Sequence, residues 1–277
     1  MSIHTHPSNF SSWWGRHTVG PDRTDLWQIG PLDLWVQHLP HQWKLSWKHG
    51  TDWLLPRVRA LPGSKGEPIP PDAQQVHCVF GSDAREEIIF APSLPDRPVV
   101  SRLATPLQVL PDETVNLYVL SPLWLRVEMA HPTKLLQEIP IYRLSDTWFG
   151  PMSNLGELCY ASTVPAFLDL REVPLRLHCV ISAVSIRNAG SDSLALDRVN
   201  VPLPRLSLFY SPRTGFWTDA FSLERKDDTE MAEIKLSHQP PHDASPSQFV
   251  SGPRRPDAES GSVIRAFSAF FRERSAF

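Results

Sequence analysis

Histidine and cysteine, the residue types that most often bind metal ions or act in nucleophilic catalysis, form two adjacent pairs in this sequence. His77-Cys78 and His178-Cys179 each lie in an alternating, strand-like pattern. Neighbours along a strand point to opposite faces of a sheet, so one pair cannot easily hold a single ion. The sequence also lacks C-x-x-C and H-E-x-x-H, the spacings that bring metal ligands together. We therefore expect buried thiols beside half-exposed imidazoles, no metal site and no cofactor.

The chain also lacks the short motifs that mark common catalytic sites. It contains no G-x-x-x-x-G-K or G-x-G-x-x-G phosphate loop and no G-x-S-x-G nucleophile elbow. Its acidic residues single out no pair for glycosidase chemistry. The sequence therefore predicts a protein that is not an enzyme. A hydrolase with a scattered site is a rival interpretation, which requires a concave pocket with converging carboxylates or histidines.

Tryptophan is concentrated near the start of the chain. Seven of the ten tryptophans fall within the first 53 residues: Trp13, Trp14, Trp27, Trp35, Trp43, Trp47 and Trp53. Aromatic rows on a sheet can stack on sugar rings, or they can fill a core or an interface. Trp35 shares its strand face with Asp33 and Gln37 and is the best surface candidate. Because tryptophan is highly buried on average, core or interface is the favoured role, and a carbohydrate-binding β-sandwich module is the alternative.

Residues 144–151, with the sequence LSDTWFGP, form the most motif-like segment of the chain. Asp146 can hydrogen-bond the turn backbone, and a Gly-Pro pair ends the strand pattern after the aromatic residues Trp148 and Phe149. The segment has two interpretations. It is either a surface for a ligand or partner, or a structural corner that plugs the end of a sandwich, and the corner is favoured because such turns are common in β-sandwich folds.

These candidate residues must be positioned by short strands. Apolar and polar residues alternate in several stretches, which predicts strands with one buried face: 32–36, 43–48, 115–119, 123–129 and 232–236. Gly30-Pro31 predicts a tight turn, and the apolar alternation changes face at Asp197-Arg198, which predicts a β-bulge. Many short strands between turn signals indicate an all-β fold made of antiparallel β-sandwich units.

The 28 prolines also exclude a helical bundle, because proline blocks helix interiors. The predicted join between two sandwich units follows the strand pattern that ends near residue 129. We therefore expect an N-terminal, tryptophan-rich unit at residues 1–131 and a second unit at residues 132–238. A single continuous two-sheet body is the alternative.

The composition changes at Gln239. Residues 239–261 contain few apolar side chains and predict a flexible linker. Residues 262–276 then predict an amphipathic helix, whose apolar stripe is formed by Val263, Ile264, Phe267, Phe270 and Phe271. A lone helix of this length is marginal in water, so its stripe should be covered. The expected covering is a partner protein or a second copy, then the protein's own body, then a membrane surface.

Charge, hydropathy and cysteine count argue against a nucleic-acid-binding, membrane-spanning or secreted protein. The net charge of −3 does not suit a general nucleic-acid-binding surface. No run of 18 apolar residues occurs, and the start of the chain has no signal-peptide pattern. The three cysteines are an odd number, whereas secreted proteins more often carry paired ones. We expect a cytoplasmic protein with at most peripheral membrane contact.

Several stretches carry a family resemblance. They include RLSDTWFGP at 143–151, GELCYAS at 156–162 and NAGSDSLALDRVNVPLP at 188–204, followed by LSLFY and FWTDAFSLER. Over about residues 13–236 the chain resembles an uncharacterised prokaryotic family, domain of unknown function 432. The resemblance implies no catalytic residues. Members of that family are often encoded beside small-conductance mechanosensitive channels, which implies an accessory or regulatory partner of such a channel.

Together these observations predict a non-enzymatic, cytoplasmic protein–protein interaction module. Its expected partner is a protein, either a mechanosensitive channel or a second copy of the chain. The expected partner-binding residues lie in the C-terminal stripe, and the segment at Asp146, Trp148 and Phe149, with Trp35, is a further surface candidate.

Overall fold

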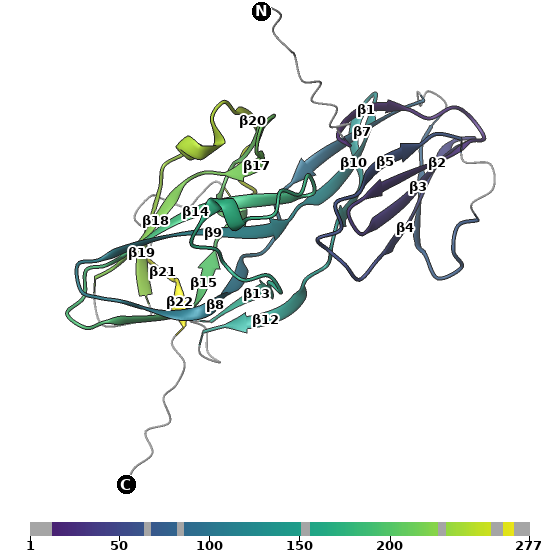
Figure 1. Cartoon of the computed structure of the whole chain (residues 1–277). Coiled ribbons are helices and arrows are strands. Elements are labelled where there is room, and N and C mark those ends of the chain that lie inside the picture. Colours follow the sequence, from purple (N-terminus) through teal and green to yellow (C-terminus); the bar gives the residue numbers. More distant parts are fainter. Residues whose placement is uncertain are drawn as a thin grey trace, which may run out of the picture. The chain divides into compact units, whose positions relative to one another are not determined.

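The computed structural model describes residues 13–63, 68–81, 86–150, 156–226, 231–255 and 263–268 (Figure 1). The fold is all-β, as predicted. Helical structure in these residues is limited to three short 3-10 turns: η1 (Leu170–Glu172), η2 (Leu203–Arg205) and η3 (His242–Ala244). None of the helices in the described part of the chain is long and apolar enough to cross a lipid bilayer.

The chain forms two compact units, each assembled from separate segments. Unit 1 comprises Met1–Ser93, Pro122–Tyr142 and Arg176–His178, and unit 2 comprises Leu94–Ser121, Arg143–Leu175 and Cys179–Phe277. The sequence instead suggested two consecutive units, 1–131 and 132–238. Segments of the two units alternate along the sequence, because strands that pair with each other come from distant parts of the chain. Independently folding domains at the expected boundaries stay a prediction.

Unit 1 contains two antiparallel sheets. The four-stranded sheet has the order β1 (Gly15–Thr18), β7 (Glu87–Ser93), β10 (Trp124–Ala130), β11 (Thr133–Pro140). The five-stranded sheet has the order β5 (Val58–Leu61), β2 (Thr24–Ile29), β3 (Leu32–Leu39), β4 (Gln42–His49), β6 (Gln74–Val79). The rings of Trp27 on β2 and Phe90 on β7 lie 5.0 Å apart, so side chains of the two sheets meet in the core.

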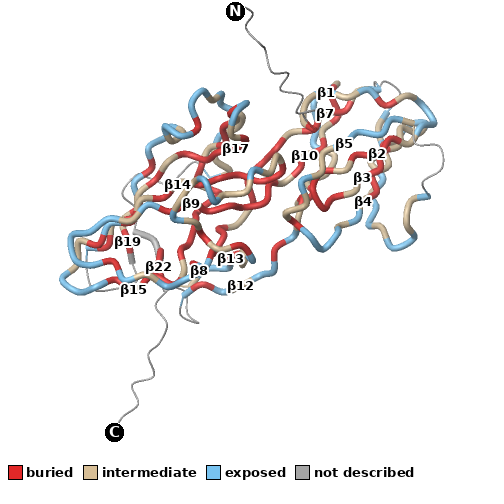
Figure 2. The backbone as a smooth tube through the Cα atoms, in the orientation of Figure 1, coloured by how far each residue is buried: buried red, intermediate tan, exposed pale blue. Residues whose placement is uncertain are grey.

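The strand patterns in unit 1 explain how its core forms. The predicted strands at 32–36, 43–48 and 123–129 are β3, β4 and β10, and their apolar residues are largely buried (Figure 2). Gly30 and Pro31 form the two-residue turn between β2 and β3, as predicted. Gly30 has φ +54°, a left-handed conformation that glycine adopts without steric cost.

Unit 2 contains two sheets, of five and eight strands, and each includes parallel as well as antiparallel strand pairs. The prediction of purely antiparallel sheets is therefore wrong for this unit. One has the order β12 (Ser145–Phe149), β13 (Glu157–Ala161), β8 (Val99–Val109), β15 (Leu194–Val201), β22 (Phe267–Ser268). The other has the order β20 (Gln248–Ser251), β16 (Leu208–Ser211), β17 (Gly215–Thr218), β14 (Cys179–Asn188), β18 (Phe221–Arg225), β19 (Met231–Leu236), β21 (Val263–Arg265), and β9 (Thr114–Pro122) pairs with β14. The predicted strands at 115–119 and 232–236 are β9 and β19. The predicted bulge is confirmed by the register shift between Leu196 and Arg198 on β15.

The predicted C-terminal helix is wrong where the structure describes the chain. Residues 263–265 form β21, which pairs with β19, and residues 267–268 form β22, which pairs with β15. The side chain of Phe267 is buried in unit 2, so it is not available to a partner. Phe270 and Phe271 lie outside the described residues. Valine, isoleucine and phenylalanine favour strands as well as apolar helix faces, and here two sheet edges accept the segment.

The predicted linker at residues 239–261 is also wrong up to residue 255. Within it, β20 pairs with β16, and Ala244 in η3 is fully buried. The backbone N–H of Arg255 donates to the carbonyl of Pro204 at 2.9 Å. These residues are held by backbone hydrogen bonds to a sheet edge and to the 3-10 turn η2, and composition carries no signal for such contacts.

Candidate interaction surface on the β12–β13 hairpin

Within the motif-like segment, residues Ser145–Phe149 form β12, an edge strand that pairs with β13. Gly150 follows β12 with φ +106°, a conformation that favours glycine, so the chain can leave the strand there. In the register Trp148 lies opposite Leu158, and Asp146 lies opposite Tyr160. Because side chains alternate along a strand, these four side chains share one face of the hairpin.

The other face of the hairpin belongs to the core. Phe149 and Cys159 are buried and form a cluster with Val100 of β8. Phe149 was a candidate for the surface motif, and the structure corrects this, since its side chain points into unit 2. Burial, followed by the nearby Glu157 carboxylate, raises the pKa of the Cys159 thiol to about 12.

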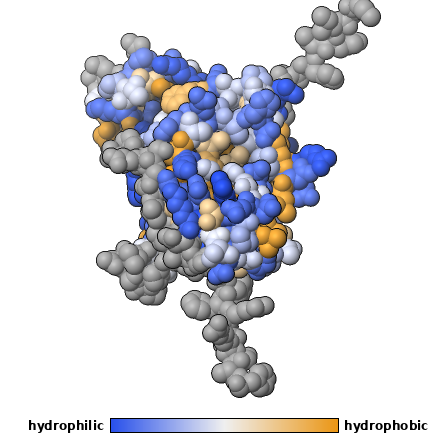
Figure 3. Space-filling view, turned by 90° about the vertical axis from the view of Figure 1, so that its left-hand side faces the viewer, coloured by the Kyte–Doolittle hydropathy of each residue, from blue (hydrophilic) through white to orange (hydrophobic). Residues whose placement is uncertain are grey.

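An apolar pair is exposed on the outer face of the hairpin. Trp148 retains 43% of its surface and Leu158 retains 42%. Trp148 is the one exposed tryptophan of the ten, all of which lie in the described residues. The face of the molecule drawn in Figure 3 is mainly hydrophilic with separate hydrophobic patches. Trp148 and Leu158 lie opposite each other in the register, and exposed apolar groups that adjoin one another can mark an interaction site.

Polar contacts fix the neighbouring side chains of this face. The guanidinium of Arg97 donates to Asp146 at 3.0 Å and lies 5.3 Å from the centre of the Tyr160 ring, a cation–π arrangement. The Tyr160 hydroxyl donates to Asp96 at 2.8 Å. Burial and then this hydrogen bond raise the pKa of Tyr160 to about 12, so it remains a neutral donor at physiological pH.

We call Arg97, Asp146, Trp148, Leu158 and Tyr160 the hairpin surface. Its charged groups are paired with each other, and Tyr160 is only 7% exposed beneath Arg97. The surface therefore offers the side chains of Trp148 and Leu158 beside the Arg97 guanidinium rather than a reactive group. Tryptophan, tyrosine and arginine are the residues enriched at the energetic centres of protein–protein interfaces. In the described ranges no three histidine, cysteine or acidic side chains come together as a possible metal site.

The sequence located part of this surface. It singled out Asp146 and Trp148, which the structure brings together, and it missed Arg97, Leu158 and Tyr160. The alternation within GELCYAS, with Leu158 and Tyr160 on one face, was an available signal, whereas Arg97 lies about 50 residues away in sequence and could not be assigned to this surface. Trp35, the other candidate, is only 4% exposed because both faces of β3 are covered at that point.

The three thiols should differ in reactivity. Cys78 is half-buried, whereas Cys159 and Cys179 are buried. With a pKa of about 12, Cys159 has a thiolate fraction of about one in ten thousand at pH 8. We expect maleimide to label Cys78 first and to reach Cys159 and Cys179 only in denaturant, as measured by mass spectrometry. Labelling of native Cys159 at the rate of Cys78 would contradict this arrangement.

Comparisons with known proteins identify a family and nothing beyond it. No curated protein and no solved structure matches the chain. A family model described as a protein of unknown function (DUF432) matches residues 13–272, which cover both units and all strands of the hairpin surface. The resemblance seen in the sequence is confirmed: the chain belongs to the DUF432 family of proteins of unknown function.

Proposed function

We propose that this chain is a non-enzymatic, cytoplasmic protein-interaction module whose body consists of β-sandwich units. In this proposal the hairpin surface binds a protein partner, and the partner is a small-conductance mechanosensitive channel. The observation that carries the interaction is the exposed Trp148–Leu158 pair beside the Arg97–Tyr160 stack. The choice of a channel rests on the family resemblance alone.

The hairpin surface can supply useful binding energy. A tryptophan side chain buries about 150–250 Å² in total, so covering the exposed part of Trp148 removes on the order of 100 Å² from water. At about 25 cal/mol per Å² this contributes about 2–3 kcal/mol before ordering costs. The Arg97–Asp146 pair already holds Arg97 in place, which lowers the side-chain entropy lost on binding.

The carbohydrate-binding alternative has less support. Stacking on a sugar chain requires several coplanar, exposed aromatic side chains. Trp148 is the one exposed tryptophan, and three others are half-buried. The remaining six are buried: Trp13, Trp27, Trp35, Trp43, Trp53 and Trp217. A single exposed tryptophan flanked by a leucine suits a protein surface better than a sugar-binding platform.

Photo-cross-linking in the native host tests this function. The full chain carrying p-benzoylphenylalanine in place of Trp148 should form one dominant cross-linked product that contains a channel subunit. The same probe in place of Leu110, which is also exposed in unit 2, is the control and should give no such product. A product with a different protein would overturn the channel assignment. Equal cross-linking from both positions would overturn the hairpin surface.

Replacing the exposed Trp148 of the hairpin surface should have little effect on the stability of the fold. Trp148 is half in solvent and lies on an edge strand, so Trp148→Ala should change the free energy of unfolding by less than about 1 kcal/mol. Phe149→Ala removes the neighbouring buried ring and should cost about 3–5 kcal/mol. Urea denaturation of both variants measures this contrast. A Trp148 variant as unstable as the Phe149 variant would indicate a core role for Trp148.

A further inference from the structure

Unit 1 contains a hollow where the edges of its two sheets meet. The hollow has a volume of about 600 Å³. Its lining comes from the end of β6 and the following residues, and from the end of β10, the turn after it and the first half of β11: Cys78, Val79, Phe80, Gly81, Met129, His131, Pro132, Lys134, Leu135 and Leu136. This volume lies in the range of ordinary ligand sites.

Both strands beside the hollow are sheet edges. Among the described residues β6 pairs only with β4, and β11 pairs only with β10. The thiol of Cys78 lies 3.6 Å from the carbonyl oxygen of Leu136, so the two edges approach each other there. An edge strand presents a row of backbone N–H and C=O groups that another strand can pair with.

Apolar side chains are left in solvent at this place. Val79 is 79% exposed and Leu135 is 51% exposed, although both lie in strands. Natural proteins usually protect edge strands with charges or bulges rather than with large apolar groups. Exposed apolar groups beside two unpaired edges therefore favour an extended occupant that covers both.

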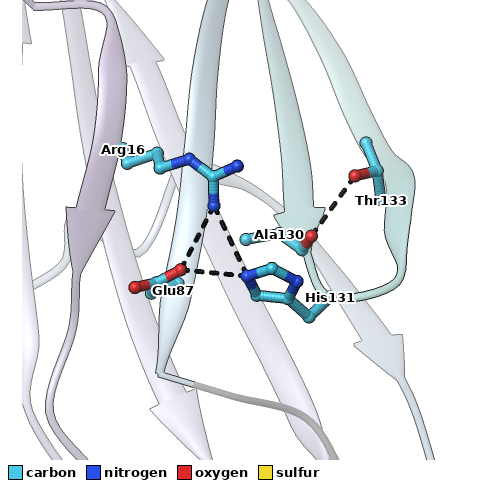
Figure 4. Close-up of polar contacts among 5 residues, drawn as sticks. All are labelled: Arg16, Glu87, Ala130, His131 and Thr133. Carbon is cyan, nitrogen blue, oxygen red and sulfur yellow. Dashed lines mark hydrogen bonds and ion pairs between the residues drawn. The ribbon is translucent and has the colours of Figure 1, made fainter.

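The charge at the hollow points to an acidic occupant. The lining holds the ammonium of Lys134 and the imidazole of His131, and none of its described residues carries a carboxylate. Glu87, which contacts His131 at 3.4 Å, is also engaged by Arg16 at 3.4 Å (Figure 4). In the part of the chain that the structure describes, Lys134 has no ion-pair partner.

We propose that this hollow binds an extended, apolar peptide segment of a partner protein that carries an acidic residue, and that the segment pairs as an added strand with β6 or β11. In strand addition, main-chain hydrogen bonds supply affinity, and pockets for alternate side chains supply specificity. Here the hollow receives the alternate apolar side chains, and Lys134 attracts the carboxylate. This site goes beyond the hairpin surface, which lies in unit 2 and has a different recognition chemistry.

A defined peptide probe tests the proposal on the full chain. The probe is an acetylated, amidated hexapeptide, Val-Thr-Val-Thr-Val-Glu, titrated into isotope-labelled protein while backbone amide shifts are followed. Two N-methylated versions block alternate N–H groups, one on the valines and one on the other residues. Only one edge of an added strand pairs, so one version should lose binding and the other should retain it. Saturable shifts should centre on residues 78–81 and 129–136.

Charge variants complete the test. Lys134→Glu should weaken binding of the acidic probe by about threefold to tenfold and should strengthen binding of a probe that ends in lysine. Lys44→Glu, which changes a lysine of β4 outside the lining, is the matched control and should leave both affinities unchanged. The proposal is overturned if no shifts occur up to the solubility limit of the probe, if both N-methylated versions bind like the parent, or if Lys134→Glu has no effect.

Discussion

Replacing Gly30 with alanine is expected to destabilise unit 1 by about 2–5 kcal/mol. Gly30 has φ +54°, where an L-residue with a side chain costs about 1–2 kcal/mol. A Cβ at this position would lie 2.6 Å from Nε2 of the buried His178 imidazole. Relieving such an overlap in a packed interior typically costs a further ~1–3 kcal/mol. The imidazole is held by its hydrogen bond to the Trp53 carbonyl at 2.6 Å, so it cannot move away freely.

Urea denaturation of the wild type, Gly30→Ala and a control variant measures this effect. Gly81→Ala is the control, because Gly81 has no positive φ and no atom lies within 4 Å of its added Cβ. Gly30→Ala combined with His178→Ala should be less destabilising than the sum of the two single changes, because the smaller side chain removes the overlap. A Gly30 variant as stable as the Gly81 variant would show that His178 is not packed against the turn.

Acid should weaken the same region through His178. Burial is the main cause that lowers the pKa of His178 to about 4. Its Nε2 donates to the Trp53 carbonyl, and its Nδ1 has no hydrogen-bond partner among the described residues, so a second proton would be buried without an acceptor. Between pH 6.5 and about 4, the His178 imidazole is protonated in the unfolded chain and neutral in the folded chain. Stability is therefore lost as the pH falls from about 6.5 to 4, by about 3 kcal/mol for this one group.

Denaturant unfolding at several pH values between 7 and 4 tests this linkage. His178→Gln keeps a donor for the Trp53 carbonyl and removes the titration, so its stability should fall less steeply between pH 6.5 and 4 than that of the wild type. His77→Gln changes an exposed imidazole of β6 and serves as the control variant for replacing a histidine with glutamine. The account of His178 is contradicted if the His178 variant and the wild type lose stability in parallel across this window.

The sequence predicted the local strands of this fold better than its long-range arrangement. Alternation located β3, β4, β9, β10 and β19, because a half-buried strand leaves a period-two pattern. It could not show that residues 263–268 complete two sheets, since strongly apolar segments suit either a helix or an edge strand. Nor could it show the pairing of β20 with β16, which depends on backbone groups and not on apolar side chains.

The candidate surface was also predictable only where local sequence patterns determine it. Turn residues around Trp148 marked the segment, and the structure places Trp148 in solvent and Phe149 in the core. Alternation failed for Trp35, because it assumes one solvated face and β3 is covered on both. The contact of Arg97 with Asp146 joins two segments that only the folded sheet brings together, and no pattern within either segment encodes it.

The central claim, that the hairpin surface binds a mechanosensitive channel, is tested most directly by equilibrium titration of the purified full chain against the purified channel in lipid nanodiscs. The account predicts saturable binding by the wild type and by the control Leu110→Ala, and an affinity at least about 30-fold weaker for Trp148→Ala, as for an interface residue worth ~2 kcal/mol or more. Binding that is absent for the wild type, or unchanged in Trp148→Ala, would contradict it.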